Sequence, residues 1–223
     1  MIRSVIFDMD GTLLDTERIY HQGWNAVAER MGLSNADESY RPICGKSRET
    51  IREIFYGFFG RDVDFDTFYG SRDRWIADYL KKNGVPAKPF AKEILSSLKE
   101  RGIGVALASA TRQPRVNSNL SETGLIGYFD AIVTGDMITH GKPDPEIFLK
   151  AAEKLGTPAG ECAVVEDALS GLQGARAAGM VPIMVHDQFI LEEARPIIAA
   201  ECDNLREVLD FILEYNRKEE GRI

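Results

Sequence analysis

The sequence predicts an α/β protein in which a doubly wound parallel sheet is interrupted by a helical insertion. From about residue 90 onward, short β-branched runs alternate with amphipathic segments that end in glycine. Repeated strand–helix units of this kind imply parallel strands joined by right-handed crossovers. A further apolar run lies at residues 2–7, but a helical pattern over residues 16–84 separates it from the others. The expected domains are therefore a core of residues 1–15 and 85–223 and an inserted helical-bundle cap of residues 16–84.

The N-terminal part is expected to hold one strand and three helices. Ile2–Phe7 is apolar and rich in β-branched residues, as in a buried strand. Apolar residues then recur at helical spacing, which predicts a helix over Thr16–Met31 that Gly32 ends. The residues of this stripe are Tyr20, Trp24, Val27 and Met31. Two further helices are expected at Arg48–Phe59 and Asp66–Lys82.

The core is expected to contain four further strands with helices between them. The strands are predicted at Ile103–Ala108, Ala131–Thr134, Ala163–Val165 and Val181–Val185. Helices are predicted at Pro145–Leu155, Ser170–Ala178 and Leu205–Tyr215. Another helix should begin where Thr111 can act as the N-cap and Pro114 fits in the first turn. Gly124, Gly156 and Gly179 lie where a helix should stop.

The composition limits the class of protein. The chain has 223 residues, a net charge of −8 and no basic block longer than two residues, which argues against nucleic acid binding. Cys44, Cys162 and Cys202 lack the spacing of a metal site, so we expect buried thiols in a reducing compartment. No run is long and apolar enough for a membrane span, and the first apolar run is too short for a signal peptide. We expect a cytoplasmic monomer or weak dimer.

Two carboxylates directly follow the first predicted strand. Asp8 and Asp10 are two residues apart, and Gly11 allows the backbone to turn sharply after them. Two neighbouring carboxylates repel each other unless a cation lies between them or one is protonated. Oxygen ligands on a tight turn suit Mg²⁺ and phosphate chemistry. The alternative is an ordinary surface turn, because Asp-Gly is a common turn pair.

Polar side chains also follow the next three predicted strands. Ser109-Ala110-Thr111 closes the second strand, Lys142 lies after the third, and Glu166-Asp167 closes the fourth. In an open parallel sheet, ligands bind outside the carboxyl ends of the strands, so these groups should share one crevice with Asp8. A hydroxyl, a lysine and several carboxylates are suited to hold Mg²⁺ and a phosphoryl group.

Each of these residues has a structural alternative. Ser109 and Thr111 could cap the following helix, and Glu166-Asp167 could cap the next one. Lys142 precedes a clear helix start, with Asp144 as N-cap and Pro145 at the first helical position. The position of all these groups at the same end of consecutive strands favours a functional site.

The four motifs resemble those of the haloacid dehalogenase superfamily. The matching segments are Asp8-x-Asp10-Gly-Thr, Ser109, Lys142-Pro-Asp-Pro and Glu166-Asp167. The insertion is similar to the C1-type helical cap of the β-phosphoglucomutase-like branch, which Gly45-Lys46-Ser47-Arg48 also resembles. The resemblance implies a Rossmann-like core and phosphoryl transfer on a small phosphorylated substrate.

The resemblance implies a role for each carboxylate. Asp8 would be the nucleophile that attacks phosphorus, and Asp10 would be the general acid and then the general base. Mg²⁺ would be held by Asp8, the main-chain carbonyl of Asp10, Asp167 and Glu166.

The resemblance also implies which residues bind the substrate. Ser109, the Ala110 amide, Thr111 and the turn at Gly11 would contact the phosphate, and Lys142 would neutralise charge on the phosphate and on the nucleophile. The candidates in the cap are Thr16, Glu17, Lys46 and Arg48. If the cap is a mobile lid, its hinges are expected at Asp15–Glu17 and Gly84–Lys88, and closure would bring Arg48 over the substrate.

The sequence favours hydrolysis over mutase chemistry. Mutases of this branch have a pattern similar to Asp-Thr-x-x-x-His. Here the pattern begins at Asp15, so Tyr20 stands at the histidine position and His21 follows one residue later. One residue is about 100° of rotation on a helix, so His21 should not take the same role. A dehalogenase is disfavoured because a halide leaving group needs no acid such as Asp10. A phosphonate hydrolase is disfavoured because it would need a lysine in the cap, and Lys46 fits that role poorly. A non-catalytic binding relative should have lost a motif residue, and none is missing.

Overall fold

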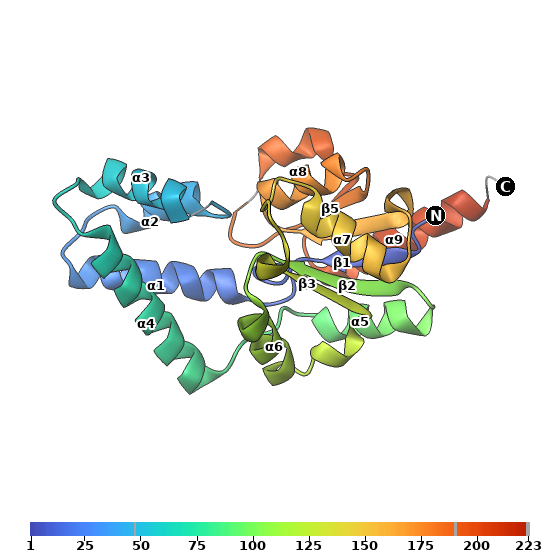
Figure 1. The fold of residues 1–223 in the computed structure, drawn as a ribbon, viewed down its shortest axis with the longest axis horizontal. Coiled ribbons are helices and arrows are strands. Elements are labelled where there is room, and N and C mark those ends of the chain that lie inside the picture. The colour runs from blue at the N-terminus through green and yellow to red at the C-terminus, as the bar shows by residue number, and fades with distance from the viewer. Residues whose placement is uncertain (47, 190, 222–223) are drawn as a thin grey trace. The chain divides into compact units, whose positions relative to one another are not determined.

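The computed structural model describes residues 1–46, 48–189 and 191–221. The chain forms two compact units, which are described separately (Figure 1). The first, the core unit, comprises Met1–Asp15 and Pro86–Ile223, and the second, the helical unit, comprises Thr16–Val85. That the helical unit acts as a cap stays a prediction. None of the helices in the described ranges is both long and apolar enough to cross a membrane.

The core unit contains one six-stranded parallel sheet with the strand order β3-β2-β1-β4-β5-β6. The strands are β1 (Ser4–Phe7), β2 (Gly104–Ser109), β3 (Ala131–Thr134), β4 (Cys162–Glu166), β5 (Val181–Val185) and β6 (Ala200–Cys202). β1 lies between β2 and β4, so that Phe7 is in register with both Leu107 and Val165. The order along the sheet reverses at β1, which is the point where doubly wound sheets bind ligands. The predicted fold class is confirmed.

Helices cover both faces of this sheet, and they are α5 (Ala91–Glu100), α6 (Gln113–Glu122), α7 (Glu146–Leu155), α8 (Leu169–Ala177) and α9 (Leu205–Glu220). α7 and α8 pack on one face, and α5 and α9 pack on the other (Figure 1). Ile6, Val164 and Phe148 belong to the apolar cluster beneath α7. Because both faces are covered, the central strands are buried along their whole length.

The helical unit consists of α1 (Thr16–Arg30), α2 (Ala36–Tyr40), α3 (Arg48–Phe59) and α4 (Phe65–Asn83). Its interior is an aromatic cluster in which Trp24 contacts Phe55 and Phe68 edge to face. The indole of Trp24 is fully buried and donates a hydrogen bond to Ser39 Oγ at 2.9 Å. Aromatic pairs with this geometry stabilise a core beyond their buried area.

Short 3-10 helices connect several of these elements, at η1 (Arg41–Ile43), η2 (Ile126–Tyr128), η3 (Gly135–Met137), η4 (Ala159–Glu161) and η5 (Glu192–Ile197).

Some sequence-based expectations were wrong in detail. Thr111 does not cap a helix, because α6 begins two residues later with Arg112 in the N-cap position and no side-chain cap. The carboxylate of Asp136 accepts a hydrogen bond from Gln113 N at 3.0 Å instead. Met31 lies beyond the end of α1 and is exposed. Cys44 is only half-buried, in contrast to the other two cysteines, and all three are free thiols.

Candidate active site

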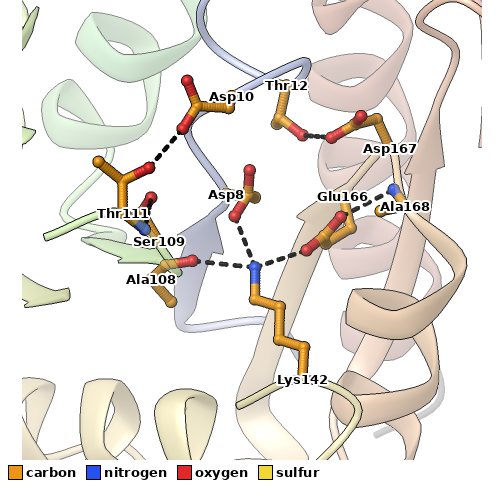
Figure 2. Close-up of polar contacts among 10 residues, drawn as sticks. All are labelled: Asp8, Asp10, Thr12, Ala108, Ser109, Thr111, Lys142, Glu166, Asp167 and Ala168. Atoms are coloured by element: carbon orange, nitrogen blue, oxygen red, sulfur yellow. Dashed lines mark hydrogen bonds and ion pairs between the residues drawn. The ribbon is translucent and has the colours of Figure 1, made fainter. Parts of the chain in front are cut away.

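The candidate residues of the core unit meet at the carboxyl ends of β1, β2 and β4 (Figure 2). Asp8 directly follows β1, Ser109 is the last residue of β2, and Glu166 is the last residue of β4. Lys142 reaches the same place from the loop between β3 and α7. Adjacent parallel strands bring groups that are far apart in sequence to one edge of the sheet.

The ammonium group of Lys142 stands at the centre of this cluster. Its Nζ lies 2.5 Å from Asp8 Oδ1 and 2.6 Å from Glu166 Oε1, and it donates a third hydrogen bond to Ala108 O at 3.1 Å. An ammonium has three donors, so these contacts use all of them. The side chain of Lys142 is 8% exposed, and that of Glu166 is 2% exposed.

Burial and neighbouring charges shift the pKa values of Asp8 and Lys142. Burial raises the pKa of Asp8 to about 7, although the neighbouring Lys142 acts in the opposite direction. Burial alone would lower the pKa of Lys142, but the attraction of Asp8 and Glu166 raises it above its ordinary value. Lys142 therefore stays protonated at neutral pH.

Three carboxylates in the cluster fit a hard divalent cation. Asp8, Glu166 and Asp167 each offer an oxygen within 4.8 Å of the others. One ammonium does not balance three carboxylates, and an all-oxygen donor set suits Mg²⁺. The donors are oriented, because Thr12 Oγ1 donates to Asp167 Oδ1 at 2.8 Å and Ala168 N donates to Glu166 Oε2 at 2.8 Å.

Two glycines leave room for these carboxylates. A Cβ on Gly11 would lie 2.2 Å from Asp167 Oδ2, and a Cβ on Gly171 would lie 1.8 Å from Glu166 Oε1. Both distances are far below van der Waals contact, so any side chain at either position would displace a candidate metal ligand. Gly11 also has φ +84°, a conformation that favours glycine.

A second group of possible metal ligands consists of His140, Asp144 and Glu146, and it is less suited to a metal ion. The carboxylate of Glu146 already accepts hydrogen bonds from Lys150 Nζ and from the amides of Thr139 and His140. These contacts, the one from Lys150 first, lower the pKa of Glu146 to about 2. The predicted N-cap role of Asp144 is shifted by one residue, since Pro145 holds the N-cap position while Asp144 Oδ1 accepts from Glu146 N at 2.9 Å.

Asp10 points toward the end of β2 (Figure 2). Its Oδ2 accepts a hydrogen bond from Thr111 Oγ1 at 2.8 Å, and Thr111 N in turn donates to Ser109 Oγ at 3.1 Å. Ser109 is buried, whereas Ala110 is exposed. Thr111 thus orients Asp10, a contact that its expected capping role did not anticipate.

The turn that carries both aspartates is fixed by its backbone. Asp8 N donates to Val165 O at 3.0 Å, which continues the β1–β4 ladder. Leu13 N and Leu14 N both donate to Met9 O, at 3.0 and 2.9 Å, and Gly11 N donates to Leu14 O at 2.9 Å. The separation between Asp8 and Asp10 is therefore set by a hydrogen-bonded loop.

The residues of the helical unit that were expected to contact the substrate differ in burial and in their partners within that unit. Thr16 is buried, and Glu17 Oε2 accepts a hydrogen bond from the buried Tyr40 hydroxyl at 2.9 Å. Lys46 is exposed. Arg48 lies 3.1 Å from Asp66 Oδ1 and 5.0 Å above the ring of Tyr69. Ser47, in the segment that resembles the β-phosphoglucomutase-like branch, lies outside the described residues.

His21 packs inside the helical unit. Its ring stacks on Tyr40 at a centroid distance of 4.2 Å, and its Nε2 lies 2.7 Å from Asp37 Oδ1. These contacts give His21 a packing function.

The structure therefore places an acidic cluster at the switch point of a doubly wound α/β sheet, where such sheets bind ligands. The chain belongs to the haloacid dehalogenase-like hydrolase family, whose model matches residues 2–179.

Three curated relatives illustrate the similarity. The chain is 33% identical over 222 residues to the phosphorylated carbohydrates phosphatase of Thermotoga maritima, covering 95% of this chain and 100% of that protein. It is 29% identical over 225 residues to the β-phosphoglucomutase of Bacillus subtilis, covering 98% and 95%. It is also 34% identical over 210 residues to protein SUPPRESSOR OF QUENCHING 1, chloroplastic, of Arabidopsis thaliana, where the match covers 87% of this chain and 19% of that longer protein.

The fold is also that of a solved structure. The crystal structure of β-phosphoglucomutase from Clostridium difficile has a TM-score of 0.76 and 24% identity, covering 98% of this chain and 99% of that one. The chain therefore shares its fold with this β-phosphoglucomutase.

Proposed function

We propose that this protein hydrolyses the phosphate monoester of a small metabolite, a sugar phosphate, through a covalent intermediate on Asp8. The observation that carries the proposal is the buried Asp8 carboxylate held 2.5 Å from Lys142 beside two further carboxylates. A structural ion pair needs no surplus of buried negative charge, whereas a site for a cation and a phosphoryl group does.

In the first step Asp8 acts as the nucleophile. A carboxylate oxygen of Asp8 forms a bond to phosphorus while the bond between phosphorus and the ester oxygen breaks. Asp10 gives its proton to the departing oxygen, which leaves as an alcohol. Thr111, which donates to Asp10 Oδ2 at 2.8 Å, keeps this carboxyl group in place.

In the second step water completes the hydrolysis. Asp10 takes a proton from a water molecule, whose oxygen bonds to phosphorus as the bond from phosphorus to Asp8 breaks. This releases inorganic phosphate and restores both carboxyl groups to their starting states. Lys142 remains protonated throughout and offsets negative charge on Asp8 and on the phosphoryl group.

Asp8, Glu166, Asp167 and the Asp10 carbonyl would hold Mg²⁺, which when bound reduces the repulsion between an anionic nucleophile and an anionic phosphate. Ser109, the Ala110 amide, Thr111 and the turn at Gly11 are our candidates for binding the phosphate oxygens. Thr16, Glu17, Lys46 and Arg48 are our candidates for contacting the rest of the substrate.

The name of the Thermotoga relative, a phosphorylated carbohydrates phosphatase, supports a sugar phosphate as substrate. The Bacillus relative supports a second candidate function, phosphoryl transfer between sugar hydroxyls, as in a β-phosphoglucomutase. The contacts of His21 with Tyr40 and Asp37 favour hydrolysis, because they give this histidine a packing function. We propose a cytoplasmic location and a monomer or weak dimer.

Phosphate release from p-nitrophenyl phosphate and from a panel of sugar phosphates, with Mg²⁺ or with excess chelator, tests the proposal. We expect release that requires Mg²⁺, and poor substitution by Ca²⁺, which prefers a larger and looser oxygen shell. Conversion of β-glucose 1-phosphate to glucose 6-phosphate, primed by the bisphosphate and faster than phosphate release, would favour the mutase. Full activity in excess chelator would contradict the proposed site.

A further inference from the structure

The two chain segments that join the units form a short two-stranded ribbon within the core unit. Asp15 N donates to Pro86 O at 2.9 Å, and Lys88 N donates to Leu13 O at 2.8 Å. Leu14 and Ala87 form an antiparallel bridge between these two hydrogen bonds. The segments Leu13–Asp15 and Pro86–Lys88, called the ribbon below, therefore form one hydrogen-bonded element, although both expected hinges overlap it.

The ribbon is continuous with the turn that carries Asp8 and Asp10. Three backbone hydrogen bonds join them, from Leu13 N and Leu14 N to Met9 O and from Gly11 N to Leu14 O. Asp10 and Leu14 also form a parallel bridge. Since few rotatable bonds separate the two elements, a shift of the ribbon must shift the turn.

Lys88 anchors the ribbon to a third part of the core unit. Its ammonium forms an ion pair with Asp187, which lies just after β5, and lies 3.5 Å from Asp15 Oδ1. The side chain of Lys88 is 17% exposed and that of Asp187 is 6% exposed. An ion pair with so little solvent access holds its partners firmly, because separating them leaves a buried charge without compensation.

We propose that Lys88 is a positioning residue for the two catalytic aspartates, an inference that rests on the proposed function. Lys88 fixes the ribbon to the loop after β5, and the ribbon fixes the backbone of the turn from Asp8 to Leu14. Attack on phosphorus requires close alignment of Asp8, and a displacement of about 1 Å can cost roughly 100-fold in rate. Lys88 thus acts on the reaction without touching the substrate.

The test compares Lys88→Met with Lys92→Met, which removes an exposed lysine on α5. Amide hydrogen exchange is measured at Gly11, Leu13 and Leu14, and turnover is measured with p-nitrophenyl phosphate. Lys88→Met should speed exchange at these three amides and lower kcat roughly 10- to 100-fold with KM nearly unchanged. Lys92→Met should behave as the wild type in both measurements.

Two further variants separate positioning from general stability. Lys88→Met with Asp187→Leu removes both buried charges, so the unfolding temperature should recover while kcat stays low and exchange stays fast. Lys88→Arg, which keeps the charge, should restore a large part of kcat. Recovery of kcat together with the unfolding temperature in the double variant would overturn the proposal, as would unchanged exchange in Lys88→Met.

The exchange measurement also separates this inference from the proposed function. Faster exchange in Lys88→Met, in a protein whose wild type releases no phosphate from any substrate, would leave the coupling of ribbon and turn intact and refute the phosphatase. Active wild type with an unaffected Lys88→Met would refute the positioning role alone.

Discussion

The ammonium group of Lys142 balances the negative charge of two buried carboxylates, Asp8 and Glu166. It touches Asp8, Glu166 and a main-chain carbonyl, and each contact comes from a different strand end. Removing the lysine would leave two buried carboxylates side by side, which is costly. The same ammonium therefore contributes both to the stability of the site and to the proposed chemistry.

Asp8→Asn should abolish turnover and leave the protein folded. Burial raises the pKa of Asp8 from its ordinary value of 3.8 to about 7. In chelator, ionising this group destabilises the folded state as the pH rises from about 4 through 7. The free energy of unfolding of Asp8→Asn, relative to that of the wild type, should therefore be larger at pH 7.5 than at pH 5. Urea unfolding at the two pH values measures this difference. Residual turnover in clean Asp8→Asn protein would rule out a nucleophilic Asp8.

Asp167→Ala should raise the Mg²⁺ concentration needed for activity. Asp167 belongs to the carboxylate cluster, and Thr12 holds one of its oxygens. Titration of activity with Mg²⁺ should shift by roughly 10- to 100-fold or more, the range seen when even outer contacts of a metal site are lost. Ser170→Ala, three residues further along, is the matched control and should leave the titration unchanged.

The cysteines should differ in reactivity. Burial raises the pKa of Cys162 and of Cys202 to about 11, whereas Cys44 is only half-buried. The thiolate is the reactive form, so at pH 8 a disulfide reagent should label one thiol quickly in the native protein and three in urea. Cys44→Ser should remove the fast phase, and three fast thiols in the native protein would contradict the burial.

At the scale of the elements, helix α8 contains a glycine with low helix propensity, Gly171, next to the candidate site. Gly171 lies within this helix, where alanine would normally be preferred by about 1 kcal/mol. The Glu166 carboxylate occupies the space of its missing side chain, and contacts with Lys142 and Ala168 hold that carboxylate. The helix therefore has its glycine where the carboxylate needs room.

Gly171→Ala should destabilise the protein by about 1–3 kcal/mol and impair Mg²⁺-dependent activity, because the new methyl group overlaps Glu166. Gly57→Ala in α3 is the control, since a Cβ there meets nothing within 4 Å. That variant should gain about 0.5–1 kcal/mol and keep its activity. Urea unfolding of both variants measures the difference, and a stabilised Gly171→Ala would contradict the close contact.

Local patterns in the sequence were sufficient for several elements. α3, β3 and β5 have the predicted bounds, because each is a distinct apolar run or stripe with clear flanking residues. α5 was missed although its buried face is regular, since its N-cap residue Phe90 has φ 66° and offers no capping side chain. β6 was also missed, because Ala200–Cys202 is short and becomes a strand only by pairing with β5.

The sequence indicated which residues meet at the site but not how they bond. The alternating pattern predicts parallel strands whose carboxyl ends lie at one edge of the sheet, so the meeting of Asp8, Lys142 and Glu166 was predictable. The hydrogen bond from Thr12 to Asp167 and the close approach of Gly171 to Glu166 depend on the conformation of loops. No local pattern encodes such contacts between distant segments.

At the scale of the whole molecule, the helical unit is the expected source of substrate specificity. Arg48→Ala should weaken the use of a sugar phosphate much more than that of p-nitrophenyl phosphate, which offers little for the guanidinium to bind. Its exposed pairing with Asp66 contributes little stability. Arg52→Ala, which removes another partner of Asp66, is the control. Equal losses of kcat/KM on both substrates would contradict a specificity role for Arg48.

The central place of β1 has a consequence for how the protein is made. β1 leaves the ribosome long before its two partners in the sheet, which are Gly104–Leu107 and Cys162–Val165. At a translation rate of about 5–20 residues per second, β1 waits roughly 5–20 s for its first neighbour and longer for the second. The aromatic cluster of the helical unit draws on Trp24, Phe55 and Phe68, so it can condense during this delay. An unpaired apolar strand must therefore persist on the nascent chain, and β1 is the segment that a ribosome-associated chaperone would be expected to bind.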